Sequence, residues 1–133
     1  MSFSFIDTNI FMYAVGATHD FRKPCQDLIE AITNGQLNAS INTEVLQEIL
    51  YRYDAIRKTE LGHDLVNTIL NTFKTIWAID ATTVQMAQKL MRTYHVKPRD
   101  AIHAASMLNN GIHTIYSYDK DFDSIPKLKR LTP

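Results

Sequence analysis

The sequence predicts a three-layer α/β/α fold with a mostly parallel central sheet, formed by residues 1–133 as one domain. Short apolar segments that end in an acid or a turn residue alternate with longer segments whose apolar residues recur at helical spacing. This alternation of strands and helices is typical of a parallel sheet covered on both faces. The 133 residues, 45% of them hydrophobic, suffice for one core, and no repeat, low-complexity segment or linker divides them.

Five strands are expected, each short and bounded by polar or turn residues. They lie at residues 3–6, 37–41, 75–79, 112–117 and 128–131. Six helices are expected because apolar residues three and four apart form one stripe along each segment. They lie at residues 10–15, 22–34, 43–56, 61–73, 84–94 and 99–108. Gly35 and Gly111 are expected to end two of these helices, and Thr82 or Thr83 to cap another.

Charge and cysteine content narrow the classes of function. Lys and Arg together number 14, as do Asp and Glu, so no overall basic field indicates nucleic-acid binding and any basic surface must be local. Cys25 is the only cysteine, which excludes an internal disulfide and fits a reducing compartment. The apolar segment 5–15 contains Asp7 and Asn9, so it is neither a signal-peptide core nor a membrane span. We expect a cytoplasmic protein with no membrane partner.

Four acids are expected at one edge of the sheet. Asp7 follows the first strand and Asp119 follows the fourth, and parallel strands end at the same edge. Asp100 begins the helix that leads into the fourth strand, and helices that return antiparallel to the strands start at that edge. Glu48 lies about one and a half turns into the helix after the second strand, on the flank of its apolar stripe. From there its side chain can reach over the same rim.

Grouped carboxylates predict a metal site. Like charges raise the pKa of one another, and burial adds to the cost of ionisation. A divalent cation removes this conflict, and oxygen ligands without His or Cys suit Mg²⁺ or Mn²⁺ rather than Zn²⁺. Such an ion keeps water ligands and recruits phosphate, which makes phosphodiester hydrolysis the chemistry expected here.

Each acid also has a structural interpretation. These are a helix cap at Asp7, a first-turn charge at Asp100, an i,i+4 ion pair of Glu48 with Arg52, and a turn at Asp119 and Asp121. Spacing alone leaves the two interpretations nearly balanced. Their shared position at one sheet edge favours the metal site.

Four segments resemble, in order, the acidic blocks of PIN-domain ribonucleases, and most closely those of VapC toxins of toxin–antitoxin pairs. They are residues 5–9 (FIDTN), 45–48 (VLQE), 99–105 (RDAIHAA) and 117–122 (SYDKDF). The similarity covers the whole chain. It implies an α/β/α fold and an endoribonuclease that depends on Mg²⁺ or Mn²⁺.

The resemblance also implies a role for each matching residue. The catalytic acids would be Asp7, Glu48, Asp100 and Asp119. Of these, Asp7, Asp100 and Asp119 would hold the main ion, and Glu48 would face a second ion or the attacking water. Asn9 and Ser117 match positions that orient the acids, although Thr is more usual where Ser117 stands. Asp121 is an accessory candidate, because an extended backbone would direct it to the same side as Asp119.

The predicted function is therefore that of a ribonuclease toxin of a type II toxin–antitoxin pair. Its expected partners are RNA, a cognate antitoxin protein and a second copy of the chain. Two alternatives stay open: an inert PIN-like module that binds RNA or protein, and a metal phosphohydrolase of small phosphate esters. Two further side chains are interpreted as packing residues: Cys25 in the core, and His103 in the core or an interface. Six basic residues are candidates for a phosphate-binding rim: Arg52, Arg99, Lys120, Lys127, Lys129 and Arg130.

Overall fold

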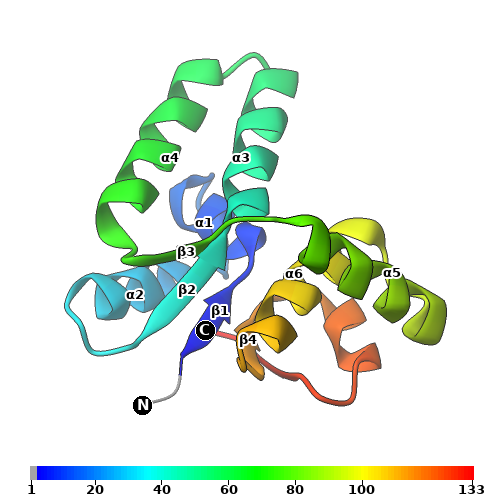
Figure 1. Cartoon of the computed structure of the whole chain (residues 1–133). Helices are drawn as coiled ribbons and strands as arrows, with labels where there is room; N and C mark the ends of the chain where they lie inside the picture. Colours follow the sequence, from blue (N-terminus) through cyan, green and yellow to red (C-terminus); the bar gives the residue numbers. More distant parts are fainter. Residues whose placement is uncertain (1–2) are drawn as a thin grey trace.

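The computed structural model describes residues 3–133 and contains a five-stranded parallel sheet with six α-helices around it (Figure 1). The predicted α/β fold class is confirmed. The strands are β1 (Ser4–Ile6), β2 (Ala39–Asn42), β3 (Thr75–Trp77), β4 (Thr114–Tyr116) and β5 (Lys129–Leu131). The helices are α1 (Thr8–Val15), α2 (Arg22–Thr33), α3 (Thr43–Ala55), α4 (Thr59–Thr72), α5 (Ala81–Tyr94), α6 (Pro98–Asn109) and the short 3₁₀ helix η1 (Lys120–Ser124).

The strand order is β3-β2-β1-β4-β5, with β1 in the centre and every neighbouring pair parallel. The chain moves from β1 outward to β2 and β3, and then returns to the other side of β1 for β4 and β5. The sheet therefore has a topological switch point between β1 and β4. In open α/β sheets the crevice outside the carboxyl ends of the strands at such a point is where ligands bind.

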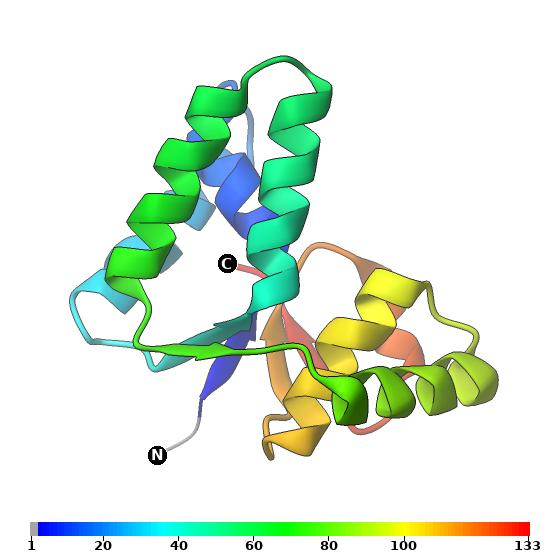
Figure 2. The same cartoon turned by 45° about the horizontal axis from the view of Figure 1, so that its top comes forward.

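The helices pack in pairs, α1 with α2, α3 with α4, and α5 with α6. The α3–α4 hairpin projects to one side of the molecule, away from α5 and α6 (Figures 1 and 2). The central strands are buried from both sides, since Phe5, Ile41 and Ile115 are fully inaccessible to solvent. The polar residues of β1 and β2 are buried as well, since Ser40 and Asn42 are also fully inaccessible to solvent, as expected for a parallel sheet that is covered on both faces.

The helices α2 and α6 end at the glycines that were predicted to end them. Gly35 and Gly111 have φ angles of +74° and +70°, a left-handed conformation that is least strained for glycine. In both turns the glycine N–H and the next residue's N–H return to carbonyls of the last helical turn, for example Gln36 N to Ala31 O at 2.9 Å. These bonds form the Schellman pattern that ends a helix. The predicted ends of α2 and α6 are confirmed.

The start of α5 was predicted wrongly. Asp80, rather than Thr82 or Thr83, caps this helix by accepting hydrogen bonds from the Thr83 N–H at 2.9 Å and the Thr83 hydroxyl at 2.8 Å. The preceding strand also ends at Trp77, two residues before the predicted end. The continuous apolar residues 76–79 resembled a longer strand, but Ile79 instead donates its N–H to the Thr43 hydroxyl at 3.2 Å.

Cys25 is fully buried in the core, in agreement with its interpretation as a packing residue. Among residues 3–133, no helix combines the length and apolar character that a bilayer crossing requires.

The α3–α4 contact depends on a glycine. A Cβ atom added at Gly62 would lie 2.8 Å from Cβ of Tyr53, an atom that cannot move without its helix. We predict that Gly62→Ala lowers the free energy of unfolding by about 1 kcal/mol or more, because overpacking outweighs the better helix propensity of alanine. Thermal unfolding monitored by circular dichroism measures this. Asn67→Ala on the exposed face of α4 is the control; a Gly62→Ala protein as stable as this control would contradict the packing argument.

Candidate active site

The register of β1 and β4 sets two acids side by side. Ile6 pairs with Tyr116, and the Asp7 N–H donates to the Tyr116 carbonyl at 3.1 Å. Asp7 therefore lies beside Ser117, at the switch point of the sheet. Asp119 follows two residues later on the same strand end. This placement results from strand pairing between segments that are about 110 residues apart in sequence.

Two helices bring the other acids to the same edge. Asn42 caps α3 by accepting from the Val45 N–H at 3.1 Å, and Glu48 then faces inward with 8% exposure. Pro98 occupies the first turn of α6, which places Asp100 in that turn with 9% exposure. A cavity of about 480 Å³ forms between these elements. It is lined by Asp7, Asn9, Met12, Glu48, Arg52, Lys97, Pro98, Arg99, Asp100 and Asp119.

Protein donors occupy every carboxylate oxygen of Asp7 and Glu48. Asp7 accepts from the Thr8 N–H at 2.7 Å and from the Ser117 hydroxyl at 2.6 Å. Glu48 accepts from the Thr8 hydroxyl at 2.9 Å and pairs with Arg52 Nε at 3.3 Å. Both acids are thus held in fixed orientations, and Thr8 links them. The cap role considered for Asp7 and the ion pair considered for Glu48 are both present, and both acids still line the cavity.

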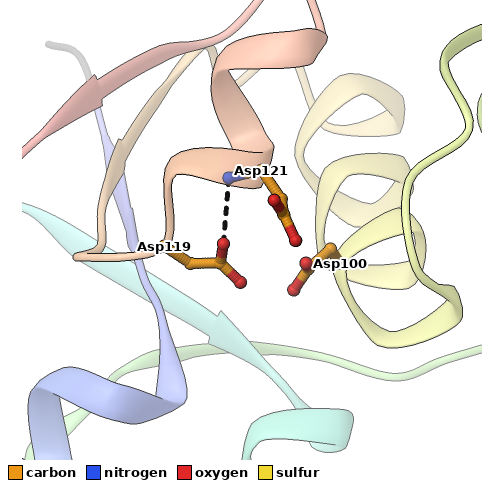
Figure 3. Close-up of side chains that lie close together, drawn as sticks. All are labelled: Asp100, Asp119 and Asp121. Carbon is orange, nitrogen blue, oxygen red and sulfur yellow. Dashed lines mark hydrogen bonds between the residues drawn. The ribbon is translucent and has the colours of Figure 1, made fainter.

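Asp100, Asp119 and Asp121 form a second acidic group with far fewer donors. One oxygen atom from each of the three carboxylates lies within 4.8 Å of the other two. Figure 3 shows the three side chains directed into one space from α6 and from the segment after β4. Within this group the hydrogen bond is that of the Asp121 N–H to Asp119 Oδ1 at 2.9 Å.

The reason given for Asp121 was wrong, although its carboxylate lies with Asp100 and Asp119. Residues 120–124 form the 3₁₀ helix η1 rather than an extended segment. Asp119 caps η1, and the first turn of this helix then folds the Asp121 side chain back toward Asp100. Asp121 does not line the large cavity, and its carboxylate approaches the group from the side of η1.

Ser117 and Asn9 lie next to these acids. The buried Ser117 hydroxyl donates to Asp7 and accepts from the Asp119 N–H at 2.9 Å. Asn9 Nδ2 lies 3.5 Å from the same hydroxyl, at the limit of a hydrogen bond. Asn9 Oδ1 is buried with no hydrogen-bond partner among the described residues.

Burial and mutual repulsion raise the pKa of Asp100 and Asp7, whereas the donors around Glu48 lower its pKa. Desolvation, strengthened by the nearby Asp119 and Asp7 charges, raises the pKa of Asp100 to about 7. Desolvation likewise raises the pKa of Asp7, against the lowering effect of the His103 imidazole and the Ser117 hydroxyl. Burial also works to raise the pKa of Glu48, but His103, the Thr8 hydroxyl and Arg52 together lower it.

Basic side chains lie on the rim of the cavity. Arg52 and Arg99, both predicted for a phosphate-binding rim, line it, and Lys97 joins them. Arg99 also lies near Glu44 and over the Tyr51 ring. Arg130, another predicted rim residue, instead pairs with Asp123 through Nε at 2.9 Å and through its terminal nitrogen at 3.1 Å.

Three residues of the site were missed or misjudged from the sequence. Thr8 was not predicted to contact Glu48, and Lys97 was not singled out. His103 was assigned to packing, and it is indeed buried at 1% exposure, yet its Nε2 lies 3.8 Å from both Asp7 and Glu48. The only sequence signal for His103 is its position three residues after Asp100, which places both on one face of α6.

The side chains suit a hard divalent cation. The facing atoms of Asp100, Asp119 and Asp121 are all carboxylate oxygens, the preferred ligands of Mg²⁺ and Mn²⁺. The pKa of Asp100 is raised by burial and by the neighbouring Asp119 and Asp7 charges, both of which a bound cation would offset. Asn9 lines the same cavity, and its buried Oδ1 has no hydrogen-bond partner among the described residues. This arrangement is therefore compatible with a cation between the acids.

The chain belongs to the PIN-domain family. The sequence model of the PIN domain matches residues 4–128, nearly the whole chain. The resemblance stated from the four acidic segments is confirmed.

Known relatives of this chain are ribonucleases of the VapC type. Ribonuclease VapC13 from Mycobacterium tuberculosis is 37% identical over 127 residues, which span 95% of this chain and 97% of VapC13. The crystal structure of M. tuberculosis VapC20, a sarcin–ricin loop cleaving toxin, matches with a TM-score of 0.79 at 17% identity, over 99% of this chain and 100% of that one. A toxin–antitoxin complex from Klebsiella pneumoniae gives a TM-score of 0.71 at 20% identity, over 98% and 97% of the two chains.

The shifted pKa of Asp100 predicts an unusual pH dependence of stability. A carboxyl whose pKa rises from 3.8 to about 7 on folding contributes stability below about pH 4 and loses it as pH rises through 7. Without divalent ions, Asp100→Asn should therefore unfold several degrees higher than the unsubstituted protein at pH 8, and the difference should shrink at pH 5. Thermal melts in EDTA at both pH values measure this. Equal differences at pH 5 and pH 8 would contradict it.

Proposed function

We propose that this chain is a Mg²⁺- or Mn²⁺-dependent endoribonuclease that acts in the cytoplasm as the toxin of a type II toxin–antitoxin pair. The observation that carries the proposal is the convergence of five carboxylates, from four separate segments, on one end of the sheet beside a basic rim. Metal-dependent hydrolysis of a phosphodiester requires negatively charged ligands that bind the metal. It also requires positively charged side chains that bind the phosphate, and the site contains both. The VapC ribonucleases that resemble this chain support the choice of RNA.

The proposed metal ligands are Asp100 and Asp119, with Asp121 as an accessory ligand and Asp7 completing the site. When bound, the ion would lower the pKa of a water molecule and stabilise charge on the phosphate oxygens. The Ser117 hydroxyl, between Asp7 and the Asp119 N–H, positions both acids.

Glu48 and the rim complete the proposed mechanism. Because the pKa of Glu48 is lowered, this side chain is ionised at neutral pH and can accept a proton from the attacking water. Lys97, Arg99 and Arg52 line the cavity where the RNA backbone would lie. Their charges would orient the phosphates rather than identify bases, so they give affinity without sequence preference.

Asp7→Asn tests the chemistry. We expect RNA cleavage to fall at least about 10²-fold, because a neutral amide cannot balance the charge of a divalent cation, while its Oδ1 can still cap α1. Cleavage of purified RNA in Mn²⁺, together with a thermal melt, measures activity and folding. Asp64→Asn on the exposed part of α4 is the matched control. Full activity of Asp7→Asn would refute the mechanism.

The two alternatives predict different results with the unsubstituted protein. An inert PIN-like module would bind no Mn²⁺ in calorimetry and would cleave no RNA. A phosphohydrolase of small esters would be inhibited by a nucleoside monophosphate at concentrations that leave an RNA endonuclease unaffected. We expect Mn²⁺ binding and RNA cleavage that resists this competitor.

An apolar groove between α1, α2 and α4 is the proposed docking surface for an antitoxin segment. It has a volume of about 400 Å³, and its apolar lining includes Phe11, Val15, Ile29 and Ile69. Val15 is 53% exposed at its edge. An accessible apolar groove of this kind indicates a partner with an apolar segment. The similar Klebsiella toxin–antitoxin complex supports an antitoxin as that partner. The predicted homodimer stays a part of the proposal, and sedimentation analysis tests it.

Val15→Glu tests the groove. We expect affinity for the cognate antitoxin to fall at least about tenfold, because an unpaired carboxylate would be desolvated on docking. Ribonuclease activity without antitoxin should not change. Leu70→Glu is the matched control, since Leu70 is an exposed leucine on α4 that does not line the groove. If both variants bind antitoxin as tightly as the unsubstituted protein, the antitoxin occupies another surface.

A further inference from the structure

His103 lies beneath the acids on the inner face of α6. Its side chain is 1% exposed and packs against the Phe5 ring at 5.3 Å between centroids. Nε2 is 3.8 Å from Asp7 Oδ1 and 3.8 Å from Glu48 Oε1, and it has no hydrogen-bond partner among residues 3–133. A buried polar atom without a partner is rare in proteins, so this one requires an explanation.

Asn42 determines which ring nitrogen carries the proton. Its Oδ1 accepts the Val45 N–H at the start of α3, which fixes the orientation of the amide. Asn42 Nδ2 therefore faces His103 Nδ1 at 3.2 Å and the Ser106 hydroxyl at 3.0 Å. An amide NH₂ only donates, so Nδ1 must accept and cannot carry a proton. Burial works to lower the pKa of His103, but the Glu48, Asp7 and Asp100 carboxylates together raise it. A second ring proton, on Nδ1, would face the Asn42 NH₂, so the ring carries its proton on Nε2, the nitrogen that faces the two acids.

We infer that His103 is a positioning residue whose Nε2–H is directed between the Asp7 and Glu48 carboxylates and holds them in their working orientation. This inference rests on the proposed ribonuclease function. It identifies a neutral donor at the buried side of the acids and Asn42 as the residue that sets its tautomer. His103 does not touch the cavity, so it acts through the two acids.

The geometry explains why a donor is needed at this position. Asp7 Oδ1 and Glu48 Oε1 are the same two oxygens that accept from Thr8, so Thr8 and His103 bracket them from two sides. Two carboxylates in a desolvated place repel, and a donor between them reduces this repulsion. The 3.8 Å distances are longer than a hydrogen bond, and hydrogen bonds at active sites often tighten when substrate binds.

A purely structural histidine would behave differently. If His103 only filled space against Phe5, a leucine of similar volume would serve, and the acids would keep their function. If the donor matters, glutamine should replace it better than leucine, because the Gln amide nitrogen can extend to the place of Nε2 and donate.

The experiment compares His103→Leu and His103→Gln in cleavage of a single-stranded RNA oligonucleotide and in Mn²⁺ affinity by calorimetry. We expect His103→Leu to lose 10- to 100-fold in kcat or in Mn²⁺ affinity, the usual effect of removing a group that supports metal ligands. His103→Gln should recover most of this loss. His63→Leu on the exposed face of α4 is the matched control and should behave as the unsubstituted protein.

Nitrogen-15 NMR of the unsubstituted protein in EDTA provides a readout that needs neither metal nor activity. His103 should show a protonated Nε2 and an unprotonated Nδ1. The opposite tautomer, or equal kcat and Mn²⁺ affinity in folded His103→Leu, would overturn the inference. If His103→Leu does not fold, a His103→Gln protein that is folded yet as inactive as Asp7→Asn would also overturn it. If the unsubstituted protein cleaves no RNA and binds no Mn²⁺, the proposed function fails, and the tautomer result still stands by itself.

Discussion

Repulsion among carboxylates gathered at one end of a parallel sheet is the constraint on which the site depends. The strand order places the ends of β1 and β4 side by side, and α3 and α6 start from the same edge. Acids at these positions cannot avoid one another. The protein meets the repulsion in two ways: donors fill the oxygens of Asp7 and Glu48, while Asp100, Asp119 and Asp121 face one another with far fewer donors.

This division gives the two groups different physical roles. The Asp7 and Glu48 side chains are held in fixed orientations by Thr8, Ser117 and Arg52. They can therefore orient bound groups without moving themselves. The second group brings three carboxylates together, and burial with the nearby Asp119 and Asp7 charges raises the pKa of Asp100, so a cation there would stabilise the ionised acids. A preorganised pair beside a charged group in need of a cation is a reasonable basis for phosphodiester chemistry.

The sequence was sufficient for the architecture and for the positions of the acids, because both follow from local patterns. Strand ends, helix starts and two glycine stops are encoded within a few residues of each feature. The prediction of where α5 starts was wrong because Asp80, Thr82 and Thr83 are all good N-cap residues. Only the hydrogen bonds in the folded protein distinguish them. Asp121 was predicted to lie with Asp119 on the assumption of an extended backbone. The sequence around it does not distinguish an extended segment from the 3₁₀ helix η1.

The residues that position the acids could not be predicted from the sequence, for a different reason. Asn42 meets His103 across 61 positions of the chain, and Thr8 meets Glu48 across 40, so their roles exist only after folding. A buried histidine among alanines is correctly predicted as a packed residue, but the direction of its Nε2 depends on the amide opposite. Long-range polar contacts of this kind have no signature in residue spacing.

The most direct measurement is the anomalous scattering of crystals soaked in Mn²⁺. If the acidic edge is a cation site, the difference map should contain a strong peak between the carboxylates of Asp100 and Asp119, with Asp7 or Asp121 within ligand distance of about 2.2 Å. Full Mn²⁺ occupancy elsewhere, or no peak at saturating Mn²⁺ and neutral pH, would contradict the account.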